Sequence, residues 1–491
     1  MATARLKLFI GGSYRPARDG QTFDSWNPAN GRLVARVAKA GVADVDDAVQ
    51  AAAAAFPAWS QRPAPERGQI ILKATEILRR RAKEFARWET LDAGKCIADT
   101  LNGDLGIGLD FLEWYGTVSL EAASGETIPV RNPLQFDFTI RQPYGVVALI
   151  SPWNFPLVTA ILKIGPALTA GNTAVMKPAS WTPITTLMLG EVFREAGLPP
   201  GVLNIVAGSG DQIGDALCGH PLVRKIFFTG STAVGKRILQ VAAEHVTATS
   251  MELGGKSANI IFADADRAQA LAGATFGLMW NNGQNCIAGS RLLVERPIYS
   301  QFVKELAARF RSLRVGDPLK STTQLGPLVS PQQRDTVLEY IRIGKQEGAR
   351  LVCGGGPPRG REFARGCFVA PTLFADVSNR MRIAREEIFG PVLVVIPFAG
   401  EDEAVAIAND TEYGLGNGVF TTNLAKAHRM IRALDSGTVY VNTYNMVNPQ
   451  SPFPSWKQSG NTVERGHHGL LENTRCKNVI MDISGQPIRW G

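Results

Sequence analysis

Cys286 lies in a segment whose composition suits a nucleophilic thiol. The polar run Asn281-Asn282-Gly283-Gln284-Asn285 precedes it, and the small or apolar residues Ile287-Ala288-Gly289 follow. A structural cysteine prefers apolar neighbours, whereas a nucleophilic one needs partial exposure and a polar setting that stabilises the thiolate. No histidine is near Cys286 in the sequence, although the fold could bring a base close to it in space. The segment alone leaves a catalytic thiol and an ordinary buried thiol both open.

Two more polar residues have neighbours that suit acid–base and oxyanion chemistry. Glu252 stands between Met and Leu, and burial of such a carboxylate raises its pKa toward that of a general base at neutral pH. Asn154 stands in Pro152-Trp153-Asn154-Phe155-Pro156, whose rigid flanks would hold its amide NH₂ in place. The alternatives are a surface carboxylate and a turn asparagine.

Two glycine-rich segments are incomplete versions of nucleotide-binding motifs. Residues 208–214 (GSGDQIG) follow a predicted strand and open a predicted helix, but they are one residue longer than the dinucleotide fingerprint GxGxxG. An ordinary tight turn fits this segment equally well. Residues 254–257 (GGKS) look like the end of a P-loop, but Ser250 stands where that motif needs its first glycine, so a P-loop is excluded.

Alternating strands and helices must position these residues. Four short apolar segments are each followed by a helical pattern, at 146–150, 173–176, 203–206 and 225–228. A second such region contains the apolar segments 259–262, 291–294, 391–396 and 439–442. This alternation predicts parallel sheets with crossover helices. Other patterns predict helices over 46–57 and 66–93 and a hairpin over 125–142. The predicted fold class is α/β, with two parallel-sheet domains and a small strand-rich element.

Composition excludes several classes of protein. The 491 residues exceed the ~250–300 of one core, and 45% hydrophobic with 20% charged residues is typical of globular chains. The net charge of +8 comes from scattered basic residues, and the run Arg79-Arg80-Arg81 lies beside Glu84 as on a solvated helix face. We therefore expect no nucleic-acid partner. No apolar run reaches the ~18 residues of a membrane span, so no membrane partner is expected either.

The cysteines and the N-terminus predict a location. Met1 to Leu8 are basic and lack the apolar core of a signal peptide. Six cysteines are too few for a disulfide scaffold, no CxxC pair exists, and the five histidines form no zinc pattern with them. We expect free thiols, no metal and a reducing cytoplasm.

Taken together, the motifs resemble those of the aldehyde dehydrogenase superfamily, of the NAD(P)-dependent, hydrolytic type. The resemblance runs from Phe9-Ile10-Gly11-Gly12 to Thr474 and Lys477, with the family's order and separations. The matching segments are PWNFP at 152–156, KPAS at 177–180, FTGS at 228–231 with Gly235, ELGGK at 252–256, GQNC at 283–286, EIFGP at 387–391, YGL at 413–415 and SPF at 451–453.

The resemblance implies roles for named residues. Cys286 is the nucleophile, Glu252 the base, and the Asn154 amide with the Cys286 backbone N–H the oxyanion hole. We expect local electrostatics to favour the Cys286 thiolate. The residues implied to bind the cofactor, NADP or NAD, are Ser151, Trp153, Lys177, Ser180, Gly210, Phe228, Gly230, Ser231, Leu253, Glu387 and Phe389. Ser180 stands where many NAD-preferring members carry a glutamate, which predicts that both cofactors are used.

The resemblance also implies a substrate tunnel, lined by Phe155, Val158, Thr159, Leu162, Trp280, Ile287 and Phe453. These residues are apolar or aromatic with no arginine among them, which favours an uncharged aliphatic or aromatic aldehyde over one with a carboxylate. Cation–π contact could also hold a cationic aldehyde. Two other functions stay open: CoA-acylating aldehyde oxidation, which would not need the base Glu252, and a non-catalytic binding or structural protein on the same fold.

Domains and assembly follow from the same resemblance. Residues 1–124 and 143–253 would form a Rossmann-like cofactor-binding domain, 254–469 the catalytic domain, and 125–142 with 470–491 an oligomerisation element of a homotetramer or homodimer. The segment 453–464 departs from the family pattern, with Pro454, Ser455 and Thr462 replacing glycines and Val463 an arginine. We expect its path to differ, because proline and β-branched residues restrict φ.

Overall fold

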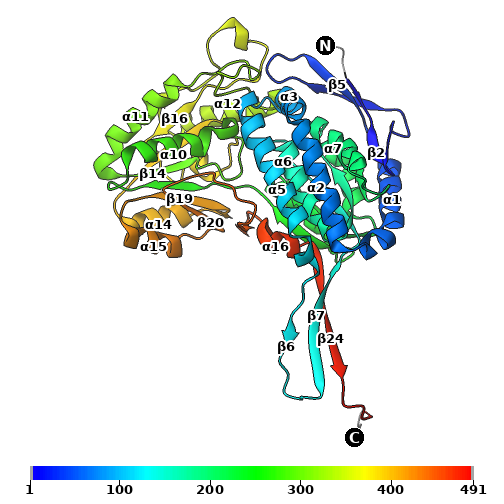
Figure 1. The fold of residues 1–491 in the computed structure, drawn as a ribbon. Helices are drawn as coiled ribbons and strands as arrows, with labels where there is room; N and C mark the ends of the chain where they lie inside the picture. The colour runs from blue at the N-terminus through cyan, green and yellow to red at the C-terminus, as the bar shows by residue number, and fades with distance from the viewer. Residues whose placement is uncertain (1–3, 488–491) are drawn as a thin grey trace.

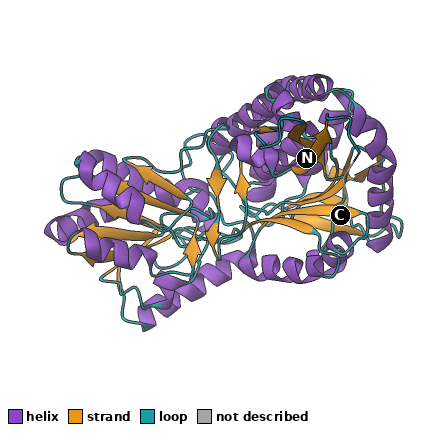
Figure 2. Ribbon diagram, turned by 90° about the horizontal axis from the view of Figure 1, so that it is seen from below, coloured by secondary structure: helices purple, strands orange, loops and turns teal. Residues whose placement is uncertain are grey.

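The computed structural model describes residues 4–487 as two α/β lobes from which a long arm projects (Figure 1). The first three residues of the N-terminal segment and residues 488–491 of the predicted oligomerisation element lie outside the described residues. Seen from below, each lobe has strands flanked by helices (Figure 2). The predicted α/β class is confirmed.

The first lobe is organised by a seven-stranded sheet. Its order is β12 (Ala248–Glu252), β11 (Val223–Thr229), β8 (Val146–Ile150), β9 (Thr173–Lys177), β10 (Leu203–Ile205), β2 (Leu8–Ile10) and β3 (Ser13–Arg15). The first five strands are parallel, and β2 and β3 are antiparallel additions at one edge. Every residue of β8 and β9 is buried, as expected where helices cover both faces of a parallel sheet.

Helices of the first lobe cover this sheet. They are α1 (Val42–Gln61), α2 (Ala64–Arg80), α3 (Ala82–Ala93), α5 (Leu105–Thr117), α6 (Pro156–Thr169), α7 (Ile184–Glu195), α8 (Gly210–Cys218) and α9 (Thr232–Ala243). The single helix predicted over 66–93 is wrong, because the chain leaves helical geometry at Arg81. The helix predicted over 46–57 is longer than expected and continues past Pro57, while Pro63 marks the start of α2.

The second lobe has a seven-stranded sheet of its own. Its order is β15 (Arg350–Cys353), β16 (Thr372–Ala375), β17 (Val392–Phe398), β14 (Arg291–Glu295), β13 (Ala258–Ile261), β19 (Gly416–Phe420) and β20 (Thr438–Val441). All neighbours are parallel except β15 with β16. The helices are α10 (Arg267–Met279), α11 (Tyr299–Ser312), α12 (Pro331–Gln346), α13 (Arg382–Arg385), α14 (Glu401–Asn409) and α15 (Leu424–Ala433).

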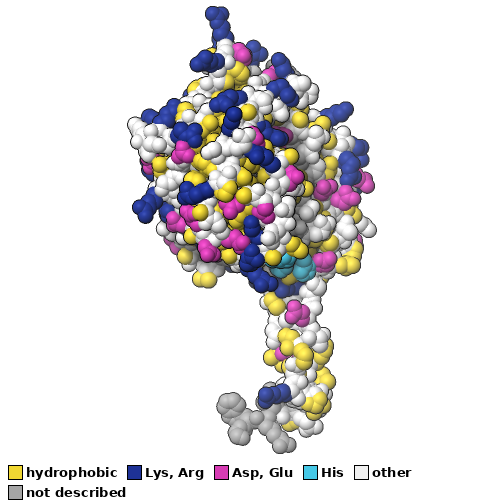
Figure 3. All heavy atoms as spheres, turned by 90° about the vertical axis from the view of Figure 1, so that its left-hand side faces the viewer, with side chains coloured by type: hydrophobic (Ala, Val, Ile, Leu, Met, Phe, Trp, Pro, Cys, Tyr) yellow, Lys and Arg dark blue, Asp and Glu magenta, His cyan; other side chains and the backbone are white. Residues whose placement is uncertain are grey.

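The arm is a three-stranded antiparallel sheet. Its central strand β7 (Gln135–Pro143) pairs with β6 (Thr127–Ile128) and, along its whole length, with β24 (Thr474–Asp482). The hairpin predicted over 125–142 thus gains a third strand from the chain end. Apolar side chains gather on the arm (Figure 3), where the exposed ones are Ile128, Val130, Leu134, Phe136, Ile480, Met481 and Ile483.

Short elements complete the fold. A small sheet joins β1 (Ala4–Leu6), β5 (Leu33–Ala38) and β4 (Thr22–Trp26). The others are α4 (Ile97–Asp99), β18 (Tyr413–Gly414), β21 (Phe453–Pro454), β22 (Trp456–Lys457), β23 (Val463–Glu464) and α16 (Gly466–Leu471). All six cysteines are free thiols. Within residues 4–487, no helix combines the length and the apolar character of a bilayer span, and no group of three or more His, Cys, Asp or Glu is placed to hold a metal.

Candidate active site

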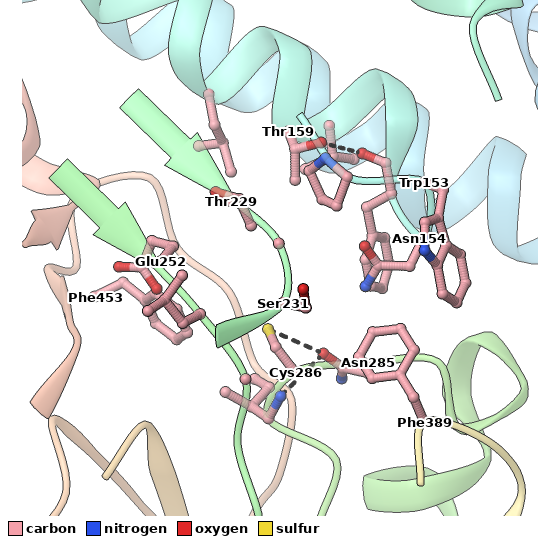
Figure 4. A pocket seen from close by; sticks show the side chains of 18 of the residues that line it. Trp153, Asn154, Thr159, Thr229, Ser231, Glu252, Asn285, Cys286, Phe389 and Phe453 are labelled. Carbon is pink, nitrogen blue, oxygen red and sulfur yellow. Dashed lines mark hydrogen bonds between the residues drawn. The ribbon is translucent and has the colours of Figure 1, made fainter. Parts of the chain in front are cut away.

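Cys286, Glu252 and Asn154 line one cavity of about 300 Å³. They come from three distant segments: Glu252 ends β12, Asn154 precedes α6, and Cys286 follows α10. Figure 4 shows Glu252 and Asn154 on either side of the Cys286 sulfur. The fold therefore brings together the three residues whose types suggested covalent chemistry.

The loop before Cys286 has an unusual backbone. Asn281, Asn282 and Gly283 have φ values of 52°, 57° and 72°, in the left-handed region that asparagine and glycine tolerate best. A Cβ on Gly283 would lie 2.2 Å from the carbonyl oxygen of Gly390, so glycine is required there. The polar run before Cys286 thus shapes a tight loop that aims the sulfur into the cavity.

Asn154 is held from both its main chain and its side chain. Its carbonyl oxygen accepts hydrogen bonds from Lys95 Nζ at 3.1 Å and from Asn281 Nδ2 at 2.8 Å. Its own Nδ2 donates to the carbonyl oxygen of Gln284 at 2.9 Å, which leaves a second N–H for another acceptor. Lys95 is itself fixed by the buried carboxylate of Asp104 at 2.7 Å, in a short π-helical turn.

Glu252 is a buried carboxyl group. Burial, reinforced by the nearby charge of Glu464, raises the pKa of Glu252 well above its usual value. Its Oε1 has no hydrogen-bond partner within the described residues. A carboxyl group with a raised pKa and a free oxygen facing a cavity suits proton transfer near neutral pH.

The electrostatics of Cys286 differ from the prediction. Burial raises the pKa of its thiol to about 12, and the carboxylates of Glu252 and Glu387 shift it in the same direction. The expectation that local electrostatics favour the thiolate is therefore wrong for this state of the protein. The physical reason is that the apolar walls that enclose a substrate also remove water from the sulfur.

The predicted cofactor residues meet at the carboxyl ends of the first sheet. Ser151, Lys177 and Leu253 follow or end β8, β9 and β12, and Gly210 and Ser231 stand at the starts of α8 and α9. Of the predicted set, those that line the cavity are Trp153, Gly230, Ser231, Leu253, Glu387 and Phe389. Ligands bind at such strand ends in open α/β sheets.

Two residues from the second lobe, Glu387 and Phe389, contact residues at the carboxyl ends of the strands of the first sheet. Glu387 Oε1 accepts a hydrogen bond from the Gly255 N–H at 3.0 Å, and burial raises the pKa of Glu387 to about 7. Phe389 has φ of 58° and packs edge-on against Trp153 with ring centroids 5.1 Å apart. Gln333 Nε2 donates to the Phe389 carbonyl oxygen at 2.9 Å, which supports this strained position.

The glycines at 210 and 214 do not have the helix–strand packing role that glycines have in the dinucleotide fingerprint. A Cβ added at Gly210 or at Gly214 would meet no atom within 4 Å. The third glycine therefore does not bring α8 close to its strand, which agrees with the imperfect spacing. Ser180 Oγ donates to the carbonyl oxygen of Gly208 at 3.0 Å, which joins this segment to the end of β9.

All seven predicted tunnel residues line the same cavity, but their surroundings are not free of arginine. Arg465 also contributes to the wall, with its Cζ 4.0 Å from the ring centroid of Phe453. The preference for an uncharged aldehyde, inferred from those seven residues, therefore leaves out a cation in the cavity wall. That inference considered only the matched positions, whereas the backbone turn at Arg465 carries this side chain back over Phe453.

The comparisons with known proteins agree with this arrangement. The sequence model of the aldehyde dehydrogenase family matches residues 14–479. The chain belongs to this family. The betaine aldehyde dehydrogenase of Brucella anthropi is 42% identical over 482 residues, which cover 98% of each chain.

Solved structures of this family have the same fold. PnpE from Pseudomonas sp. WBC-3, solved in complex with nicotinamide adenine dinucleotide, is 41% identical, with a TM-score of 0.96 and 98% of each chain covered. An aldehyde dehydrogenase from Bacillus cereus, in an NAD⁺ complex, is 40% identical, with a TM-score of 0.95, 98% of this chain and 97% of that one covered. This aldehyde dehydrogenase is thus an NAD(P)-dependent oxidoreductase acting on aldehydes, and the non-catalytic alternative is set aside.

The residues present fit such a cofactor. Ser151 Oγ and Thr229 Oγ1 are buried without a hydrogen-bond partner among residues 4–487, at the strand ends where the dinucleotide is expected. A Cβ on Gly230 would lie 2.4 Å from the Phe228 ring, so only glycine fits at this position before α9. Ser231 caps α9, whose free N–H groups suit a phosphate.

Sequence reasoning missed several residues of this aldehyde dehydrogenase site. Glu464 and Arg465 line the cavity, and the buried Lys163 Nζ lies 2.7 Å from Glu464 Oε1. Their segment was noticed only because it departs from the family pattern. No local signal places Lys163 beside Glu464, because 301 positions separate them.

Proposed function

We propose that this aldehyde dehydrogenase oxidises an aldehyde to a carboxylic acid through a thioester on Cys286. The observation that carries the proposal is the convergence of Cys286, Glu252 and Asn154 on one cavity. The thiol gives its proton to solvent, and its sulfur adds to the aldehyde carbon, forming a thiohemiacetal. The free N–H of the Asn154 amide, together with the Cys286 backbone N–H, stabilises the oxyanion.

The second half of the reaction depends on Glu252. When bound, NAD(P) supplies a nicotinamide ring that accepts hydride from the former aldehyde carbon, leaving a thioester. Glu252 then removes a proton from a water molecule that attacks the thioester carbon, and the Cys286 sulfur leaves. Trp153, Glu387 and Phe389 line the end of the cavity at which the cofactor is expected.

The decisive experiment compares acyl acceptors. The enzyme is mixed with an aldehyde and NAD⁺ or NADP⁺, with and without CoA, and both the reduced cofactor and the acyl product are measured. We expect free acid in both mixtures and no acyl-CoA. Formation of acyl-CoA only when CoA is present would support the CoA-acylating alternative instead.

The residues at and after the end of β9 determine our proposal on the choice between NAD⁺ and NADP⁺. Ser180 is uncharged and Lys177 lies three residues before it, so no carboxylate at this position repels a 2′-phosphate. Burial lowers the pKa of Lys177 to about 8, so the ammonium form prevails at neutral pH and is available to a phosphate. We infer that NADP⁺ is used at least as well as NAD⁺.

The substitution Ser180→Glu is expected to lower kcat/KM for NADP⁺ at least about tenfold more than for NAD⁺, since ~1.4 kcal/mol of repulsion is tenfold in affinity. Ser180→Gln is the matched control, because it adds the same bulk without charge and should change the two cofactors alike. Steady-state kinetics with both cofactors test this. A hundredfold preference of the unmodified enzyme for NAD⁺ would contradict it.

We also propose the division of labour among the parts of the fold. Residues 1–124 and 143–253 bind the cofactor, 254–469 carry the nucleophile, and 125–142 with 470–491 mediate assembly. The reducing cytoplasm remains our proposed location, in keeping with six free thiols.

The arm predicts a homo-oligomer, as a tetramer or a dimer. Its exposed apolar side chains would be a liability on an isolated chain of 52.9 kDa. Light scattering at micromolar concentration should give a multiple of the chain mass. The exchange Phe136→Asp with Ile480→Asp should yield smaller species, and a monomeric unmodified protein would refute the assignment.

A further inference from the structure

Arg465 places a guanidinium group in the aromatic part of the substrate cavity. Its Cζ lies 4.0 Å from the ring centroid of Phe453 and 5.9 Å from that of Phe111, and all three residues line the cavity. The cation therefore lies in the wall of the cavity that also holds Cys286.

Within the described part of the chain, this guanidinium has no ion-pair partner. Among residues 4–487, no carboxylate forms an ion pair with Arg465, and its Nε is buried without a hydrogen-bond partner. The adjacent carboxylate, Glu464, is already paired with Lys163 at 2.7 Å. That pair is neutral, and burial raises the pKa of Glu252, the other carboxyl group that interacts with Arg465, so that its neutral form is favoured. When Glu252 is protonated, Arg465 is the unpaired charge of this wall, and an arginine has several planar donors to offer an anion.

The backbone directs the side chain to this place. Arg465 is the single residue between β23 and α16, with φ of 63° and ψ of 173°, a conformation that non-glycine residues rarely adopt. Because Glu464 pairs with Phe453 in the register of β23 and β21, the turn brings Arg465 over the Phe453 ring. Strained positions of this kind are concentrated at functional sites.

We propose that Arg465 binds a carboxylate at the far end of the substrate, so that the preferred substrates are short aldehydes bearing a terminal carboxylate. This proposal rests on the proposed aldehyde oxidation and names its substrate class. A guanidinium binds a carboxylate with two parallel charge-assisted hydrogen bonds, and it repels a cationic aldehyde from the aromatic face that it already covers. The order of preference is therefore carboxylate, then neutral, then cation.

A second role for Arg465 has to be distinguished from this one. Its positive charge also lowers the pKa values of Cys286 and Glu252. If that were its main contribution, replacing it would slow the oxidation of every aldehyde alike, whatever group stands at the far end. The test therefore compares substrates that differ only in that group.

The experiment measures kcat/KM for 5-oxopentanoate, its methyl ester and 4-(trimethylammonio)butanal, which share a spacer of three methylenes. We expect the unmodified enzyme to prefer the carboxylate to the ester by about tenfold or more. Arg465→Gln should remove that preference by lowering kcat/KM for the carboxylate at least about tenfold more than for the ester, and Arg465→Lys should keep part of it. Shorter and longer oxo acids then give the best distance between aldehyde and carboxylate.

Controls separate the outcomes. Arg432→Gln removes an exposed arginine on α15 and should leave all three constants unchanged. Retained binding of NADP⁺ shows that the Arg465 variants are folded. An unmodified enzyme that favours the ester or the cation, or a parallel loss on all substrates in Arg465→Gln, overturns the carboxylate assignment while leaving aldehyde oxidation intact. No turnover of any aldehyde would instead contradict the proposed function.

Discussion

The substitution Cys286→Ala is expected to lower aldehyde oxidation by at least about 10³-fold, because it removes the only atom on which the proposed covalent intermediate forms. The methyl side chain fills less space and adds no charge, so the loop at 281–283 and the cofactor residues should stay in place. Binding of NAD⁺ and NADP⁺, measured by protein fluorescence, should therefore survive. Oxidation is followed by the absorbance of the reduced nicotinamide.

Two further variants make this test specific. Cys286→Ser retains the shape of the side chain but supplies a poorer nucleophile, so it should also be nearly inactive. Cys476→Ala removes the exposed thiol of the arm and should keep full activity. Appreciable turnover by Cys286→Ala, or an equal loss in Cys476→Ala, would show that the chemistry does not depend on the Cys286 sulfur.

The substitution Glu252→Gln is expected to separate the two halves of the reaction. Because the charge of Glu252 is one of those that raise the pKa of Cys286, a neutral amide leaves the thiol at least as easy to ionise. The first turnover should proceed, whereas hydrolysis of the thioester loses its base and slows by about 10²–10⁴-fold. Rapid mixing should show one equivalent of reduced cofactor per site, followed by a slow steady state.

Two more readouts identify the blocked step. Intact mass spectrometry should detect the acyl group on the variant during the slow phase. In the unmodified enzyme the steady-state rate should rise with pH, because the raised pKa of Glu252 keeps it protonated at lower pH and only the ionised form accepts a proton. The variant should lack this rise. Absence of a first turnover would assign Glu252 to activation of the thiol instead.

Patterns in the sequence predicted the sheets well but helix boundaries less well. The apolar segments that became β8 and β9 are buried on both faces, and this burial is what a continuous apolar run indicates. The break at Arg81 between α2 and α3 leaves no such trace, because apolar residues at helical spacing continue on both sides of it. The hairpin was visible, but its third strand depends on a pairing between residues more than 300 positions apart.

The candidate site divides in a similar way. Cys286, Glu252 and Asn154 were recognised from their local motifs, and the fold gathers them in one cavity with the predicted tunnel residues. The arginine of that cavity was not predicted, although its segment was recognised as unusual. The resemblance to the family indicates only those tunnel residues whose positions match the family's. Arg465 is not at such a position and reaches the tunnel through the backbone turn at φ 63°.

The sequence by itself determined the fold class, the family and the enzyme class, and it predicted Cys286 as the nucleophile, because these depend on residue types and spacings that are local in the chain. Only the tertiary structure decided the environment that raises the pKa of Cys286 and the placement of a charged side chain in the substrate tunnel. The pKa of a thiol depends on how much water the surrounding walls exclude and on which carboxylates face it. Likewise, the sequence does not show whether Arg465 is a surface charge or a group in the cavity wall. That depends on where the turn at Arg465 directs its side chain and on whether a carboxylate lies close enough to pair with it.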